Sequence, residues 1–326
     1  MAGRFPRFDT TRLTLRPLSE RRHDLDASIA REPAPVAQVR PEIGLVARRI
    51  REARRRGAPV IAMMGAHVIR SGVQRQLIDL MERGLVTGLA GNGACAIHDY
   101  ELARIGATTE SVALYIRDGR FGLWRETGEL NAVAALAARE DLGLGEALGR
   151  QIASGGPQKF PRADISLFAA AHRLGLPFTT HVGIGYDIVC EHPDYDGGAW
   201  GKASHADFLV FARQLEALEG GVILSLGSAV MGPEVYLKAL AMARNVAAQE
   251  GRQIAHFTVM VSDLHALSSE PGREAPRGSA EYYFRPLKTM LVRTVADGGE
   301  SVYVCGTHAE VVPELWTALL GGGEGS

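Results

Sequence analysis

This sequence has few lysines, no closely spaced pair of cysteines, no surplus of one charge and no long hydrophobic run. Its 326 residues include 36 basic and 37 acidic side chains, so no basic surplus points to a nucleic-acid partner. Cys95, Cys190 and Cys305 form no CxxC pair, which argues against a disulfide framework or a thiolate zinc site. No window approaches the roughly 20 apolar residues of a membrane span, and the N-terminus has no hydrophobic signal core. We therefore expect a cytoplasmic protein without a membrane partner.

Basic charge is carried almost entirely by arginine and is concentrated near the N-terminus. Lysine stands at four positions only, whereas arginines crowd the start of the chain, notably in RRIREARRR from Arg48 to Arg56. Ile43 and Val46 precede that run at helical spacing, so a solvated helix face explains it better than a nucleic-acid site. We expect residues 1–57 to form an arginine-rich N-terminal helical arm before a main domain over residues 58–326.

Apolar runs alternate with amphipathic segments along the main domain. Val60 to Met64 has no polar alternation, as in a strand covered on both faces. Ser71 and Gln74 have the spacing of a capping box before a helix from about 72 to 83. Further strands are expected at 85–90, 176–181, 221–226, 256–261, 289–295 and 302–305, and helices at 166–174, 207–218, 233–248 and before residue 320. This alternation predicts an α/β fold with a Rossmann-like, doubly wound, mostly parallel sheet.

Glycine and polar residues gather where the expected strands end. In open parallel sheets, ligands bind in the crevice beyond the carboxyl ends of the strands. The nucleotide fingerprint GxGxxG is absent, and a single glycine turn is weak evidence by itself. Repetition of such turns at several strand ends therefore carries the expectation of a binding site at this edge.

Several segments resemble deoxyhypusine synthases in the same order along the chain. They are HVIRSGVQRQLIDLMERGLVTGLAGNGACAIHDYE from His67, the strand that ends on 183–187, LSLGSAVMGPEV from Leu224 and VCGTHAEVVPELW from Val304. GNGACAIHDYE also resembles a GNALAVHDIE stretch in the nicotinamide-binding domain of archaeal ornithine cyclodeaminases. The resemblance covers about residues 58–318 and implies an NAD-binding domain of the deoxyhypusine synthase type.

The resemblance also implies a set of cofactor positions at the strand ends. For NAD these are Ser71, Gly72, Asn92, Gly93, Ala94, Asp99, Gly183, Asp187, Gly227, Ser228, Ser262, Asp263, Gly306 and Thr307. Asp99 stands near the family's acidic position and is either a ribose ligand or a carboxylate favoured by a helix N-terminus. Because the family builds its sites between subunits, a homodimer or tetramer is implied as well.

Lysine chemistry is the point at which the sequence departs from the family. Deoxyhypusine synthases form an imine on the lysine of a late Trp-Gly-Lys element, whereas Trp200-Gly201-Lys202 comes too early in this chain. Lys288 stands in the expected place, and it is either a carbonyl-trapping nucleophile or an ordinary surface lysine. His181, at a strand end, is either a proton shuttle or a packed histidine.

The expected function is NAD-dependent chemistry on a small amine or amino-acid-like substrate, by hydride removal and imine formation. Two alternatives remain open. One is a dinucleotide or nucleotide sensor without catalysis. The other is a metal-assisted hydrolase or lyase that uses the histidines and carboxylates of residues 190–207.

Overall fold

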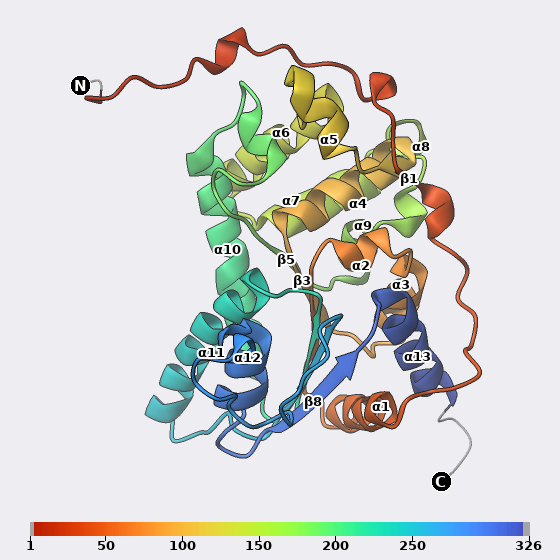
Figure 1. The fold of residues 1–326 in the computed structure, drawn as a ribbon, viewed down its shortest axis with the longest axis vertical. Coiled ribbons are helices and arrows are strands. Elements are labelled where there is room, and N and C mark those ends of the chain that lie inside the picture. Colours follow the sequence, from red (N-terminus) through yellow and green to blue (C-terminus); the bar gives the residue numbers. More distant parts are fainter. Residues whose placement is uncertain (1–2, 322–326) are drawn as a thin grey trace.

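A six-stranded parallel sheet organises the molecule (Figure 1). The computed structural model describes residues 3–321. The strands are β2 (Val60–Met64), β3 (Gly88–Asn92), β5 (Phe178–His181), β6 (Val222–Leu226), β7 (Thr258–Asp263) and β8 (Glu300–Cys305). Their order β5-β3-β2-β6-β7-β8 is 3-2-1-4-5-6 when these six are counted along the chain. Dinucleotide-binding Rossmann folds have this order, so the predicted α/β, Rossmann-like fold is confirmed.

Successive residues of the strands face two different hydrophobic clusters. Ala62 and Leu224 lie side by side and face one cluster, whereas their neighbours Ile61 and Ile223 face the other. Helices α1 (Pro41–Arg55), α3 (Gln74–Glu82), α9 (Leu167–Leu174) and α13 (His308–Leu320) belong to the first cluster. Helices α10 (Gly197–Leu215) and α11 (Met231–Gln249) and the π-helix Pro286–Arg293 belong to the second. The sheet is therefore covered on both faces, as its apolar strands require.

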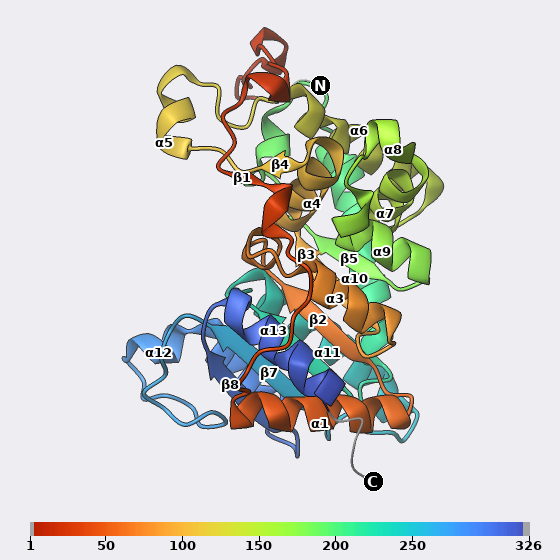
Figure 2. The ribbon, with the colours of Figure 1, turned by 90° about the vertical axis from the view of Figure 1, so that its right-hand side faces the viewer.

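A helical region joins β3 to β5 and lies beyond one end of the sheet (Figures 1 and 2). It contains α4 (Gly93–Ile105), α5 (Val112–Tyr115), α6 (Arg125–Glu140), α7 (Leu144–Ser154) and α8 (Gly156–Lys159) before α9. The short strand β4 (Ala107–Thr108) pairs with β1 (Leu25–Asp26), so the N-terminal segment is attached to this region. Because α4 starts where β3 ends, the region rises from the carboxyl edge of the sheet.

The expected N-terminal helix is present as α1, and its apolar side is part of the main core. Ile43, Val46 and Ile50 are fully buried in the same cluster as the strands. Two arginines of α1 anchor it elsewhere in the chain: Arg49 pairs with Glu300 of β8, and Arg51 donates to carbonyl groups at the end of α13. The arginine run thus holds a helix in place, and the boundary after residue 57 stays a prediction.

Three local expectations were wrong. The Ser71 hydroxyl donates to the carbonyl of His67, at the end of a short helix α2 (His67–Arg70), so it does not cap α3. Residues 289–295 belong largely to the π-helix instead of a strand, because a short apolar run fits either structure. Helix α10 begins at Gly197, well before residue 207, because the Asp196 carboxylate caps its first N–H groups. Within residues 3–321, no helix is long and apolar enough to cross a membrane.

Candidate functional site

The strand order reverses between β2 and β6, whose carboxyl ends meet at two glycines. Gly65 follows β2, and its N–H donates to the carbonyl of Leu226 at 3.0 Å. A Cβ on Gly65 would overlap with the backbone of Gly227, which itself has a φ of +62°. Neither position has room for a side chain, because the Gly227 backbone and the His308 ring fill the space, so the two strand ends pack closely where the strand order reverses.

Several polar atoms near this edge have no hydrogen-bond partner among the described residues, and two of them lie on β7 and α13. These two are Oγ of Ser262, near the end of β7, and Nδ1 of His308, the first residue of α13. The His308 ring packs against Gly227. Burial lowers the pKa of His308, and the charge of the nearby His67 lowers it further. His308 is therefore a neutral imidazole with a free nitrogen beside the strand ends.

A cavity of about 260 Å³ opens beside the first turn of α4. Its lining comes from five places that are distant in sequence: the segment before β1, which supplies Arg21, α2, α4, the segment after β4 and the loop after β5. Ile97, Val112, Phe121 and Ile188 supply apolar walls. Concave sites of this kind, with few polar groups on apolar walls, are typical of small-molecule pockets.

Three buried polar atoms around this cavity lack a partner within the described part of the chain. They are Nε of Arg70, Oγ1 of Thr109 and Oδ2 of Asp187, and all three residues line the cavity. Buried polar groups are normally hydrogen-bonded, so three unpaired ones in one place indicate a missing ligand or water. Thr109 also has a φ of +67°, a left-handed conformation that a β-branched residue rarely adopts. Such strain is concentrated at functional sites.

The Asp187 carboxylate lies against the start of α4. A Cβ on Gly93 would overlap with it, so glycine permits this close approach. Burial raises the pKa of Asp187 to about 6. Nearby, Nδ1 of His98 is 2.8 Å from the hydroxyl oxygen of Thr108, and burial lowers the pKa of His98 to about 4. The cavity therefore combines a carboxyl group that titrates near neutrality with a neutral imidazole.

The other acidic and basic groups of the cavity are already paired. Glu101 is buried and accepts two hydrogen bonds from Arg21, at 2.9 and 2.7 Å, together with those of Thr108 and Thr127. Glu110 accepts the backbone N–H of Gly122 and the indole N–H of Trp124. These hydrogen bonds hold the two carboxylates in the cavity wall. Arg70 and Asp187 are the charged lining residues that keep an unpaired side-chain atom within the described part of the chain.

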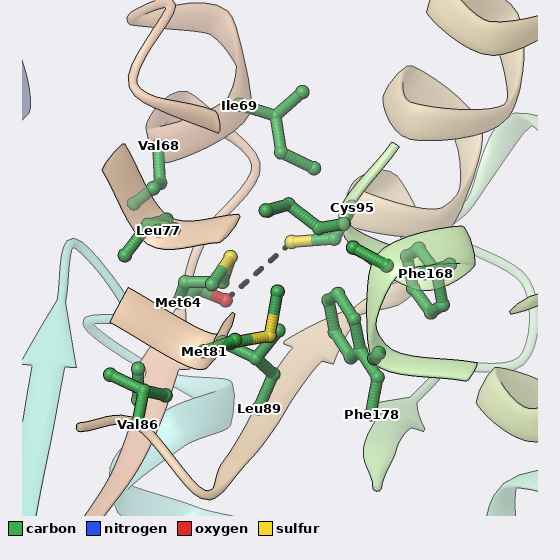
Figure 3. Close-up of a cluster of buried hydrophobic side chains, with 14 of the residues drawn as sticks. Met64, Val68, Ile69, Leu77, Met81, Val86, Leu89, Cys95, Phe168 and Phe178 are labelled. Atoms are coloured by element: carbon green, nitrogen blue, oxygen red, sulfur yellow. Dashed lines mark hydrogen bonds between the residues drawn. The ribbon is translucent and has the colours of Figure 1, made fainter. Parts of the chain in front are cut away.

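The structure brings several of the predicted cofactor positions to this edge of the sheet. Asn92 caps α4 by accepting the N–H of Cys95, and Ala94 lines the cavity next to Gly93. The Tyr186 ring folds over Gly183 in the same turn that carries Asp187. Cys95, in the first turn of α4, belongs to a cluster of buried apolar side chains, and in Figure 3 its thiol points to the carbonyl of Met64.

Other predicted positions lie at the edge but serve their own backbone. The Ser228 hydroxyl accepts the N–H of Gly232, and Thr307 forms a capping box with Glu310. These bonds fix the loops after β6 and β8. The remaining positions at this edge are Gly227, Ser262, Asp263 and Gly306.

Some predicted positions are not brought to the cavity. Asp99 is buried, and its two oxygens accept the hydroxyl of Ser166 at 2.5 Å and the N–H of Leu167 at 2.8 Å. Its carboxylate thus fastens α4 to the start of α9, and we leave Asp99 out of the proposed site. Gly72 is pressed against the backbone of Ile29, which gives it a packing role.

The two candidate catalytic residues have other neighbours. His181 is buried, with Nε2 3.0 Å from the hydroxyl oxygen of Thr179, and burial lowers its pKa to about 4. The Lys288 ammonium lies 3.4 Å from the centre of the Tyr282 ring, in the connection between β7 and β8. Neither side chain lines the cavity beside α4.

Sequence reasoning did not select Arg70, Thr109, His98 or His308. His98 and His308 stand inside the quoted segments GNGACAIHDYE and VCGTHAEVVPELW, next to positions that were selected. No pattern marked Arg70 or Thr109, because their importance depends on contacts between distant segments.

The loop of the metal-assisted alternative, residues 190–207, does not gather ligands. The imidazole of His192 contacts the carbonyl of Gly122, and the Asp207 carboxylate accepts the N–H groups of Gly145 and Thr180. Among residues 3–321, no three His, Cys, Asp or Glu side chains form a group that could hold a metal ion. The structure thus gives the metal-assisted alternative no ligand set.

No protein-family model and no curated protein matches the chain. Solved structures do match. ArgZ, an arginine dihydrolase from the ornithine-ammonia cycle in cyanobacteria, has 17% identity and a TM-score of 0.50, over 87% of this chain and 34% of that one. A variant of AgrE in complex with L-arginine has 18% identity and a TM-score of 0.50, over 87% of this chain and 33% of that one.

A candidate deoxyhypusine synthase from Entamoeba histolytica matches with 10% identity and a TM-score of 0.43, over 86% of this chain and 88% of that one. At that score the match carries no argument about function. The chain spans about a third of the length of the ArgZ and AgrE chains. At these identities, what the chain shares with the two proteins is the fold.

Proposed function

We propose that this protein binds NAD along the carboxyl edge of its sheet and uses it on a small amino-acid-like substrate in the cavity beside α4. The observation that carries the proposal is the set of three unpaired buried atoms, on Arg70, Thr109 and Asp187, in a cavity at the ligand-binding edge of a 3-2-1-4-5-6 sheet. The resemblance to NAD-binding families supports the choice of cofactor.

The residues at the edge fit a dinucleotide. Gly65 and Gly227 allow the two strand ends to pack closely at the point where the strand order reverses, and His67 on α2 is exposed beside it. Ser262 and His308 offer a hydroxyl and an imidazole nitrogen without protein partners among the described residues. We place the nicotinamide end towards the cavity, because the titratable groups that amine oxidation requires lie there.

The chemistry follows from the charges in the cavity. Bound NAD would supply the acceptor for a hydride. Arg70 would hold a substrate carboxylate, and Asp187 would pair with the substrate amine. The substrate ammonium would have to lose a proton before the carbon that bears it could give up hydride, and the Asp187 carboxylate would accept that proton. A carboxyl group with a pKa of about 6 is suited to this transfer near neutral pH.

Two comparisons guide the choice of substrate class. AgrE is solved with L-arginine, and ArgZ is named an arginine dihydrolase. Those activities belong to chains about three times longer, so only the class of ligand, an amino acid, is proposed here. Deoxyhypusine synthase activity is not proposed, because Lys288 packs on Tyr282. Assembly as a homodimer or tetramer stays a prediction.

Calorimetry with NAD tests the cofactor assignment. We expect micromolar binding by the wild-type protein, and binding at least about tenfold weaker in His67→Glu, because a carboxylate on α2 repels the pyrophosphate. His205→Glu is the matched control: His205 is also exposed, but it lies on α10 and should leave binding unchanged.

Failure of the wild-type protein to bind NAD, NADH and NADP would overturn the proposal. An equal weakening of NAD binding in His67→Glu and His205→Glu would show that the crevice near α2 is not the NAD site. NAD binding without turnover of any amine or amino acid would support the alternative of a dinucleotide sensor.

A further inference from the structure

The cavity beside α4 has one free carboxylate and one free guanidinium, and this limits the ligands it can hold. Asp187 is 7% exposed, and its Oδ2 has no partner within the described residues. Arg70 keeps Nε unpaired, while its NH1 lies 3.3 Å from Nε2 of His67. One cation site and one anion site match the ammonium and the carboxylate of a single α-amino acid.

A second ammonium group on the ligand would find no further carboxylate oxygen without a hydrogen-bond partner among the described lining residues. The carboxylate of Glu101 already accepts four hydrogen bonds, from the Arg21 guanidinium and from the hydroxyls of Thr108 and Thr127. Both oxygens of Glu110 are also engaged, by backbone and indole N–H groups. Among the lining residues that the structure describes, no carboxylate besides Asp187 has an unpaired oxygen.

The rest of the lining is suited to an apolar side chain. Ile97, Val112, Phe121 and Ile188 supply hydrocarbon surface, and the ring of Tyr186 stands at the same cavity. Val112 and Tyr186 are well exposed, at 54% and 63%. An apolar ligand side chain would cover this surface, whereas a charged end would lose its hydration without a compensating bond.

We propose that the cavity selects α-amino acids with an apolar side chain over those with a cationic one. The inference rests on the proposed function for the location of the substrate site. It differs from what the ligands of the fold neighbours suggest, since AgrE is solved with L-arginine. The difference follows from Glu101, which is paired with Arg21, and from Glu110, whose two oxygens already accept N–H groups of this protein.

Binding of L-norleucine and L-lysine tests the inference, because the two differ mainly at the end of the side chain. Calorimetry at pH 7.5, with and without NAD, is expected to show norleucine binding at least about tenfold more tightly than lysine. Val112→Glu places a new carboxylate on the cavity wall and should reduce or reverse this preference. Leu114→Glu is the matched control, since Leu114 is exposed on the same short helix but does not line the cavity.

The outcomes separate the inference from the cofactor assignment. Lysine binding as tightly as norleucine, or no binding of either by a protein that binds NAD, would overturn the inference and leave the cofactor assignment standing. Norleucine binding by a protein that does not bind NAD would support the inference and overturn the proposed function. A preference that survives Val112→Glu would show that the amino acid binds elsewhere.

Discussion

Asp187 and Gly93 are in such close contact that the glycine has no room for a side chain. The carboxylate of Asp187 occupies the space that a Cβ at position 93 would fill, at the first residue of α4. The helix N-terminus favours the charged form of this carboxyl group, and burial opposes it. The position of the proposed amine-binding group is therefore set by a backbone atom of another element.

Replacing this glycine is expected to move the carboxylate without unfolding the protein. Gly93→Ala should weaken norleucine binding about tenfold or more, because a displacement of about 1 Å is costly at a binding site. Gly201→Ala is the control, since a Cβ there meets nothing within 4 Å on α10. Calorimetry and urea unfolding together measure the effect, and unchanged binding in Gly93→Ala would place the ligand away from Asp187.

Asp187→Asn is expected to stabilise the fold at alkaline pH while it abolishes ligand binding. The pKa of Asp187 is about 6 in the folded protein against 3.8 ordinarily, so the folded state holds this proton more tightly than the unfolded state. Stability therefore falls as pH rises from about 4 to 6, by about 3 kcal/mol in total. Because asparagine does not titrate, this loss of stability with rising pH is absent in Asp187→Asn.

Urea unfolding at pH 5 and pH 8 measures this effect. The gain from Asp187→Asn should be larger at pH 8 than at pH 5 by about 1 to 2 kcal/mol. An equal effect at both values would mean that the carboxyl group titrates normally. Norleucine binding by the wild-type protein should strengthen from pH 5 to pH 7, because only the carboxylate form pairs with an ammonium.

The buried pair of Arg21 and Glu101 is expected to be essential for stability. Arg21→Met leaves Glu101 charged and unpaired in the interior, which should lower the free energy of unfolding by about 3 to 5 kcal/mol. Arg16→Met, which breaks the exposed pair with Glu20, should change it by less than about 1 kcal/mol. Similar losses in both variants would contradict the buried role.

Acid should weaken this pair in the wild-type protein. Burial by itself raises the pKa of Glu101, but the Arg21 charge and the hydrogen bonds lower it below its ordinary value. The pair therefore contributes its full stability above the ordinary pKa of glutamate and loses it as pH falls through the lowered value. When pH falls from 6 to 3, the free energy of unfolding measured with urea should fall less in Arg21→Met than in the wild-type protein.

Lys288→Ala is expected to leave NAD binding and turnover unchanged. Its ammonium lies over the Tyr282 ring, so removal should cost about 0.5 to 1 kcal/mol of stability. Lys238→Ala, on the exposed side of α11, is the control for loss of one positive charge. Loss of turnover in a folded Lys288→Ala protein would establish the catalytic lysine that the sequence order suggests.

The sequence was most informative about the strands and their ends. Val60 to Met64 forms the predicted strand, with Gly65 directly after it, and Asn92-Gly93 marks the end of β3 clearly. The apolar run over 289–295 was ambiguous, because strand and helix can both bury such a segment. The start of α10 was missed because its cap, Asp196, lies in a stretch rich in glycine and aspartate, which is typical of loops.

The sequence predicted only some of the residues that line the cavity. Asp187 and Ala94, which line the cavity, were selected because the family resemblance implies cofactor positions in the loops at the strand ends. Arg70 and Thr109 were not, because α2 and the segment after β4 reach the cavity only through tertiary packing. Asp99 was selected for its position, but whether an acidic side chain faces a ligand or a neighbouring helix depends on contacts such as the one with Ser166.

Helix α1 has its apolar side covered by helix α13, and this has a consequence for synthesis on the ribosome. Val46 of α1 and Val311 of α13 belong to one core cluster, yet residues 56–307 separate the two helices along the chain. At ordinary translation speeds, on the order of ten seconds or more pass between the synthesis of α1 and the synthesis of α13. During that interval the apolar side of α1 is exposed on the nascent chain, with arginines beside it. We therefore expect chaperones that shield apolar segments to bind α1 at this stage.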